Sequence, residues 1–177
     1  STNDMVCFFS TRKVDCKIKN EKDKKLKNFR KDLSLVAENL AKKIILDGEG
    51  ASKFIEVNVH GAKNYSDAKK VAFSIANSPL VKTAIAGEDA NWGRIIMAIG
   101  KAKVPLIQNK ITLKFGNIII IKNGELYYNY KESQVSKYLK RKEISINVNL
   151  SLGKGNSTVW TCDFTKEYIS INADYRS

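Results

Sequence analysis

Residues 47–60 read DGEGASKFIEVNVH, and this stretch decides the fold because it joins a helix to a strand through a glycine turn. Glycines at positions 48 and 50 free the backbone for tight turns and for close approach to another group. After the turn, apolar Ile55, Val57 and Val59 alternate with polar side chains, a pattern typical of a half-buried strand. We therefore predict that a helix ends before the turn and that a β-α-β unit begins after it.

Upstream of the turn, apolar side chains recur every three or four residues and predict a helix over residues 28–46. These side chains are Phe29, Leu33, Val36, Leu40 and Ile44. The preceding segment, residues 12–31, contains ten Lys or Arg against three acids, and we interpret it as a solvated connection. The short apolar run at residues 5–9 predicts a buried strand.

Downstream of the turn, helices and then strands are expected. Ser66 is a candidate cap for a helix over residues 68–76, and a strand is predicted at 80–85. Residues 87–93 are expected to lead into a helix that holds Ile95, Ile96 and Ile99 and is closed by Gly100. Asn123-Gly124 predicts a hairpin between strands at 118–122 and 125–130. The remaining expectations are a short helix at 133–139 and strands at 144–152, 158–164 and 168–175. The fold class is α/β (α+β) with antiparallel elements, and a boundary near Gly50 divides the chain into domains 1–50 and 51–177.

Composition bounds the function. The 177 residues carry a net charge of +13, three cysteines and one histidine, so neither a disulfide framework nor a zinc site is expected. No apolar run approaches the roughly 20 residues that span a bilayer, and no signal segment is expected, which favours a cytoplasmic protein without a membrane partner. The charge raises a nucleic-acid-binding module as an alternative, but stacking aromatics are sparse in the basic segment, so nucleic acid is not the expected partner.

Several polar residues at junctions are candidates for chemistry. Glu49, between two glycines, can present a carboxylate to a substrate amine or be an ordinary acidic turn residue. Glu88 and Asp89 can bind a metal with Asn91 or cap the following helix, and capping is favoured. Lys53 and Arg94 can clamp a carboxylate or pair with nearby acids.

No catalytic triad, phosphate loop or dinucleotide fingerprint is present in the 177 residues. His60 is expected in a strand with no obvious nucleophile beside it. Ser1 at the start of the sequence leaves open an N-terminal-nucleophile amidase or aminopeptidase, in which the α-amine is the base.

Longer segments carry a resemblance to a known family. They are STND (1–4), DGEGASKFIEV (47–57), ANSPLVKTA (76–84), GEDANWGR (87–94), GNSTVWTCD (155–163) and YRS (175–177). The sequences and the order of these segments resemble those of the glutamate N-acetyltransferases of arginine biosynthesis, also called ornithine acetyltransferases. The resemblance runs from the first residue to the last, with residues 13–27 least similar. It implies the ornithine acetyltransferase/DmpA-like fold and places this chain in the C-terminal part of the family's β chain.

The resemblance also implies a reaction. Family members cleave themselves into an α and a β chain, and the new N-terminal threonine of β is the nucleophile. That threonine takes acetyl from N2-acetylornithine and passes it to glutamate through an acyl-enzyme, without metal or bound cofactor. Some members also use acetyl-CoA, and two αβ units assemble into a heterotetramer. The expected partners of this chain are therefore the α chain and the remaining β-chain segment.

Residue by residue, the resemblance assigns Glu49 to the ornithine amine and assigns Asn172 and Ser177 to contacts with the bound amino acid. The family's catalytic threonine is expected upstream of the segment that resembles residues 1–4, so Thr2 is not assigned as the nucleophile. No catalytic residue is therefore expected in this chain, and we expect the chain alone to be inactive.

Overall fold

The long helix that the apolar stripe predicts is α1, Leu26–Leu46. In the computed structural model, which describes residues 5–11 and 13–174, the chain forms two compact units, one ending at Leu40 and the other beginning at Ala41. Before α1, the Asp23 carboxylate accepts the backbone N–H groups of Lys19 (3.1 Å) and Lys25 (3.0 Å). Lys43 in the last turn suits the negative end of the helix dipole.

The apolar stripe of α1 is uncovered. None of the helix's 21 residues, all of them described, is buried. Phe29, Val36, Leu40 and Ile44 each expose more than half of their area. The strand predicted at residues 5–9 is wrong, because these residues are irregular and exposed. An isolated apolar run needs a neighbouring strand for its backbone groups, and the described residues offer it none.

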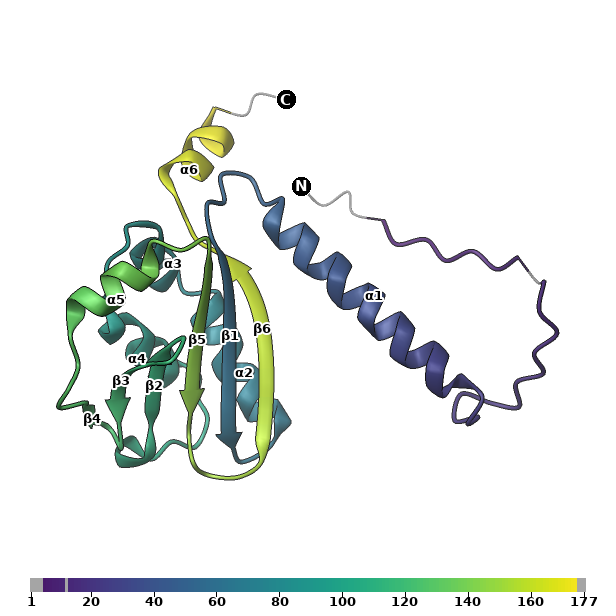
Figure 1. Ribbon diagram of the computed structural model, residues 1–177, viewed down its shortest axis with the longest axis horizontal. Coiled ribbons are helices and arrows are strands. Elements are labelled where there is room, and N and C mark those ends of the chain that lie inside the picture. Colours follow the sequence, from purple (N-terminus) through teal and green to yellow (C-terminus); the bar gives the residue numbers. More distant parts are fainter. Residues whose placement is uncertain (1–4, 12, 175–177) are drawn as a thin grey trace. The chain divides into compact units, whose positions relative to one another are not determined.

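The second unit is built on a six-stranded sheet, drawn in Figure 1, with the order β4-β3-β2-β5-β1-β6. The strands are β1 (Phe54–Ala62), β2 (Thr112–Phe115), β3 (Ile118–Lys122), β4 (Glu125–Leu126), β5 (Glu143–Asn149) and β6 (Gly155–Cys162). The helices of this unit are α2 (Tyr65–Ala76), α3 (Pro79–Ala86), α4 (Trp92–Lys101), the 3-10 turn Gln108–Lys110, α5 (Glu132–Leu139) and α6 (Lys166–Ala173). The mixed α/β class is confirmed.

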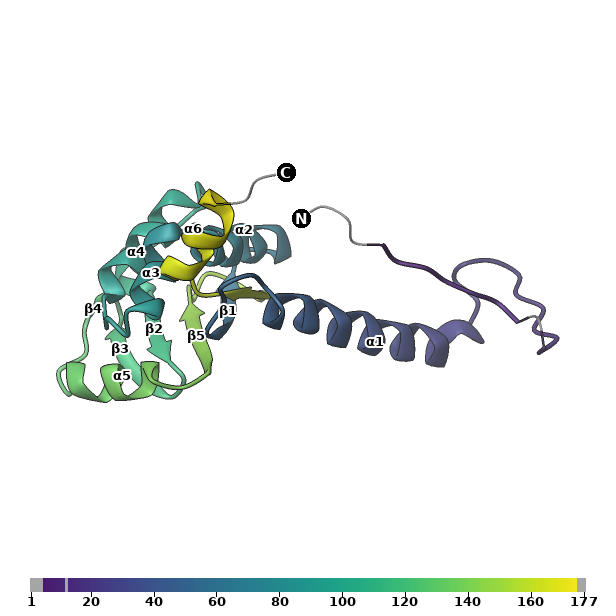
Figure 2. The same cartoon turned by 90° about the horizontal axis from the view of Figure 1, so that it is seen from above.

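The strand after the glycine turn, β1, lies inside the sheet. It pairs in parallel with β5, where Val57 opposes Ile146, and antiparallel with β6, where Val57 opposes Val159. The alternation predicted for β1 holds, because Ile55, Val57 and Val59 are buried on one face. Helices α2, α3 and α4 lie on one side of the sheet and α5 on the other (Figure 2).

The hairpin prediction at Asn123-Gly124 is confirmed between β3 and β4. Both residues have positive φ, 53° and 79°, as the tightest hairpin turns require. Strand β4 is only two residues long, so the predicted strand at 125–130 was too long.

The strand predicted at residues 80–85 is wrong, because this segment is the helix α3. Pro79 occupies its first turn and the Ser78 hydroxyl caps it by accepting the Val81 N–H at 3.4 Å. Val81, Ala84 and Ile85 are buried at helical spacing. The predicted cap Ser66 is also wrong, since the side chain of Asn64 caps α2 instead.

The last predicted strand, residues 168–175, is wrong over its described part, because α6 covers Lys166–Ala173. Five residues of alternating polarity fit a short strand as well as a single helical face. The chain turns out of the sheet after β6, so no strand edge receives this segment, and helical hydrogen bonds satisfy its backbone instead.

Candidate functional site

The glycine turn presents Glu49 at the C-terminal end of α1. The turn is closed by the Ala51 N–H, which donates to the Gly48 carbonyl at 2.9 Å. Gly50 has φ +66°, and a Cβ there would lie 2.9 Å from the Cα of Tyr168 and closer still to its backbone nitrogen. Glycine is therefore required at position 50, because α6 packs directly on its backbone.

Helix α6 is tied to this turn from its N-cap residue onward. The Thr165 hydroxyl, at the N-cap position, donates to the Gly50 carbonyl at 2.6 Å. Two turns later, the Asn172 amide donates to the Tyr168 carbonyl (2.9 Å) and to a carboxylate oxygen of Glu49 (3.2 Å). The fold thus brings together two predicted site residues that lie 123 positions apart in sequence. Ser177, the third, lies outside the described residues.

Glu49 and Asn172 are both exposed, so a solute can reach them. A carboxylate beside a primary amide offers acceptors for an ammonium group and a donor that keeps the carboxylate in place. The pair is suited to binding an amine-bearing small molecule. Neither side chain is a nucleophile, so the pair can place a substrate but cannot by itself transfer an acyl group.

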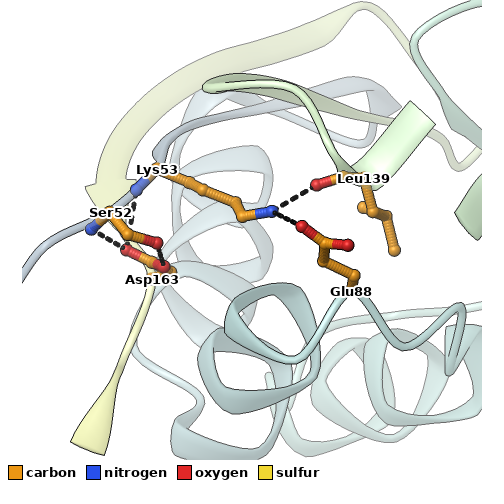
Figure 3. A network of polar contacts seen from close by, with 5 residues as sticks. All are labelled: Ser52, Lys53, Glu88, Leu139 and Asp163. Carbon is orange, nitrogen blue, oxygen red and sulfur yellow. Dashed lines mark hydrogen bonds and ion pairs between the residues drawn. The ribbon is translucent and has the colours of Figure 1, made fainter. Parts of the chain in front are cut away.

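A second cluster of polar contacts lies immediately after the turn (Figure 3). The buried Asp163 carboxylate accepts the backbone N–H of Ser52 (2.8 Å) and of Lys53 (2.9 Å), and also the Ser52 hydroxyl. The Lys53 ammonium points the other way, to a Glu88 carboxylate oxygen at 2.9 Å and to the Leu139 carbonyl. The sequence assigned no role to Asp163, which ends the family-like segment 155–163, or to Thr165, because their partners lie more than 100 residues away.

Lys53, Glu88 and Arg94, for which the sequence left both binding and structural roles open, make contacts within the fold. Lys53 pairs with Glu88, and its side chain is only 7% exposed. The capping prediction for Glu88 and Asp89 is wrong, since α4 starts at Trp92, its N-cap residue is Asn91, and no side chain makes a cap bond. The Arg94 guanidinium ties α4 to α3 by donating to the Leu80 carbonyl at 2.9 Å. Among the described residues, no group of His, Cys, Asp and Glu could hold a metal ion.

A polar ladder crosses the sheet on the face opposite α2. Glu56 accepts from the Trp160 indole (3.1 Å) and from Asn58 (2.9 Å). Asn58 also accepts from the Thr158 hydroxyl at 2.7 Å. His60, at the far end of β1 from Glu49, lines a cavity of about 390 Å³ near this ladder. His60 therefore does not belong to the Glu49 site.

Outside the Glu49 site, the pKa values of Tyr130 and Asp23 are shifted from their ordinary values. Burial, with smaller contributions from Glu132 and Asp89, raises the pKa of Tyr130. Backbone N–H groups of Lys25 and Lys19 lower the pKa of Asp23 below its ordinary value.

Over the described residues, no helix combines the length and the apolar character needed to cross a membrane.

Comparison with known proteins finds a single family along the whole chain. A family model described as "ArgJ family" matches residues 1–177. The "Arginine biosynthesis bifunctional protein ArgJ" of Brucella melitensis biotype 1 is 49% identical over 181 residues, and that of Caulobacter vibrioides is 47% identical over 178. These alignments cover 100% of this chain but only 44% of each relative, so the chain spans less than half of their length.

A solved structure is similar as well. The crystal structure of the arginine biosynthesis bifunctional protein ArgJ from Bacillus halodurans matches with a TM-score of 0.83 and 44% sequence identity. The match covers 88% of this chain and 73% of the solved chain.

Proposed function

This chain belongs to the ArgJ family, and from that premise we propose that it forms the ornithine-binding side of an N-acetyltransferase. The complete enzyme would move acetyl from N2-acetylornithine to glutamate, giving ornithine and N-acetylglutamate. The observation that carries the proposal is the contact between Glu49 and Asn172 at the glycine turn, 3.2 Å long and open to solvent. Ser177, which the family resemblance also assigns to the bound amino acid, remains part of this proposal.

Glu49 suits the donor substrate for a chemical reason. N2-acetylornithine carries its acetyl group on the α-nitrogen, so its one free ammonium is at the end of the side chain. The Glu49 carboxylate would accept hydrogen bonds from that ammonium, while the Asn172 amide holds the carboxylate from the other side. Glutamate has a carboxylate where acetylornithine has its side-chain ammonium, so Glu49 offers no partner to that end of glutamate.

The proposed chemistry is covalent and proceeds in two steps. A threonine hydroxyl from outside these 177 residues attacks the acetyl carbonyl, the amide C–N bond breaks, and ornithine leaves with the proton. The amine of glutamate then attacks the ester, and the threonine hydroxyl is restored. Preorganised donors, which we also place in another chain or segment, stabilise the oxyanion in both steps. Glu49 and Asn172 hold the donor substrate so that its acetyl group meets the nucleophile.

Replacing Glu49 tests this proposal in the full-length protein that carries this segment. Glu49→Ala is expected to raise KM for acetylornithine about tenfold, since a hydrogen bond to a charged group contributes roughly 1.5–3 kcal/mol and exposure weakens it. KM for glutamate is not expected to rise. Glu167→Ala removes an acid from α6 that is also exposed, and is the matched control. An unchanged KM for acetylornithine in Glu49→Ala would contradict the assignment.

We propose further that α1 docks on the rest of the family's polypeptide, supplied as an α chain and the remaining β-chain segment. Four side chains of its apolar stripe, Phe29, Val36, Leu40 and Ile44, are exposed, and apolar side chains gathered on one exposed face are typical of an interaction surface. The chain spans 44% of the curated relatives but 73% of the solved chain. The solved chain is thus shorter than the whole relatives, which supports a protein divided into more than one chain.

A further inference from the structure

Asp163 is a buried carboxylate that, among the described residues, accepts hydrogen bonds only from uncharged groups. It is 3% exposed, and its oxygens accept two backbone N–H groups and one hydroxyl from Ser52 and Lys53. The Lys53 ammonium points away from Asp163 to Glu88 (Figure 3). Burying a carboxylate without a cation is unfavourable unless donors surround it. The structural role of the Asp163 carboxylate is therefore to hold the backbone at Ser52 and Lys53.

The bonds of Asp163 connect two segments that would otherwise separate. The ladder between β1 and β6 ends at the pair Phe54 and Cys162. One residue further, the Asp163 N–H donates to the Lys53 carbonyl at 3.2 Å, and the carboxylate reaches back to Ser52. Asp163 thus extends the connection between the two strands beyond the sheet, toward the turn that carries Glu49.

Two further contacts continue this connection in the same order. Thr165, two residues after Asp163, binds the Gly50 carbonyl, and Asn172 binds Glu49. The turn contains two glycines and is intrinsically free, so its position depends on these contacts. The Asp163 contacts are the buried ones, whereas the contact between Asn172 and Glu49 is exposed.

We propose that Asp163 is a positioning residue for the donor substrate. It fixes the turn that carries Glu49 against the start of the helix that carries Asn172, so that both side chains face one ligand. The proposal rests on the proposed function of Glu49 in binding acetylornithine. Asp163 touches neither substrate nor nucleophile and acts through the turn.

Substitutions at Asp163 in the full-length protein separate geometry from charge. Asp163→Ala leaves the Ser52 and Lys53 N–H groups without their acceptor and is expected to raise KM for acetylornithine about tenfold, with KM for glutamate unchanged. Asp163→Asn keeps one acceptor oxygen for both N–H groups, and the Ser52 hydroxyl can accept from the new amide. Asp163→Asn is therefore expected to restore most of the affinity for acetylornithine.

A double-mutant cycle with Glu49 decides between positioning and general stability. If Asp163 acts through Glu49, Asp163→Ala causes no further rise in KM in a Glu49→Ala background. Equal effects of Asp163→Ala with and without Glu49 would overturn the proposal. If Glu49→Ala itself leaves KM for acetylornithine unchanged, the proposed function of Glu49 fails first, so the two failures are distinguishable.

Stability controls keep the result interpretable. Val159→Ala weakens buried packing on β6 without touching the turn and is compared with Asp163→Ala by thermal unfolding. Ser52→Ala removes only the hydroxyl donor and keeps both backbone bonds, so its rise in KM is expected to be smaller than that of Asp163→Ala. A rise in KM for acetylornithine in Val159→Ala as large as in Asp163→Ala would also overturn the proposal.

Discussion

The absence of a Cβ atom at Gly50 allows the site to form. With φ +66° and α6 lying against its backbone, this position has no room for a side chain. The same close approach allows Thr165 to reach the Gly50 carbonyl and sets Asn172 opposite Glu49. Glycine is thus needed at position 50 for two reasons. It adopts the positive φ of the turn, and its lack of a side chain lets two segments make contact.

Gly50→Ala is expected to detach α6. The left-handed conformation costs an alanine about 1–2 kcal/mol, and the clash with Tyr168 adds to that cost. Amide hydrogen exchange should show lost protection in α6. Gly100→Ala is the control, because nothing lies within 4 Å of a Cβ at that helical position, and it should stabilise the protein by about 0.4–1 kcal/mol. Full α6 protection in Gly50→Ala would contradict this account.

At the scale of the element, a charge placed in the exposed stripe of α1 is expected to weaken docking of this chain on the rest of the enzyme without impairing its folding. Val36→Asp puts a charge in the middle of the stripe and should prevent association with the rest of the enzyme. The unfolding of this chain alone should barely change, because Val36 is exposed there. Ser34→Asp puts the same charge on another face of the helix. Size-exclusion chromatography of co-expressed chains measures association, and equal association of both variants would exclude the stripe as the interface.

The start of α1 is expected to respond to acid. Because the folded pKa of Asp23 lies below its ordinary value of 3.8, the ionised carboxylate stabilises the turn before α1. This stabilisation is complete above pH 3.8 and is lost as pH falls through the folded pKa. The amide resonances of Lys19 and Lys25 should titrate with it in NMR spectra, and Asp23→Asn should abolish that titration. Resonances that stay constant as pH falls through this range would exclude the contact.

Elements with strong periodicity could be predicted from the sequence, and short apolar ones could not. The stripe of α1 and the alternation of β1 each repeat often enough to select one period. Residues 80–85 are apolar at most positions, so α3 became distinguishable from a strand only through packing and the Ser78 cap. Glu49 and Asn172 came from a family resemblance, whereas Asp163 needed the structure, because its partners lie 110 and 111 residues away.

At the scale of the whole molecule, activity is expected to require more than these 177 residues. This chain produced alone should transfer no acetyl from acetylornithine to glutamate, because we place the nucleophile outside it. Co-expression with the remaining part of the family's polypeptide should give activity, and intact mass should show which chains are present. Activity of this chain alone would contradict the proposal, and its loss in Ser1→Ala would then indicate an N-terminal nucleophile.

The pairing of β1 has a consequence for how the protein is made. Both neighbours of this strand come late in the chain, since Phe54 pairs with Glu143 and with Cys162. On the ribosome, β1 therefore emerges long before either partner, with Ile55, Val57 and Val59 still uncovered. Contacts between such distant residues slow folding and leave apolar segments open to association with other chains. The sheet can close around β1 only after β6 has emerged, so until then helix α2, which packs on β1, is the neighbouring element that can shield it.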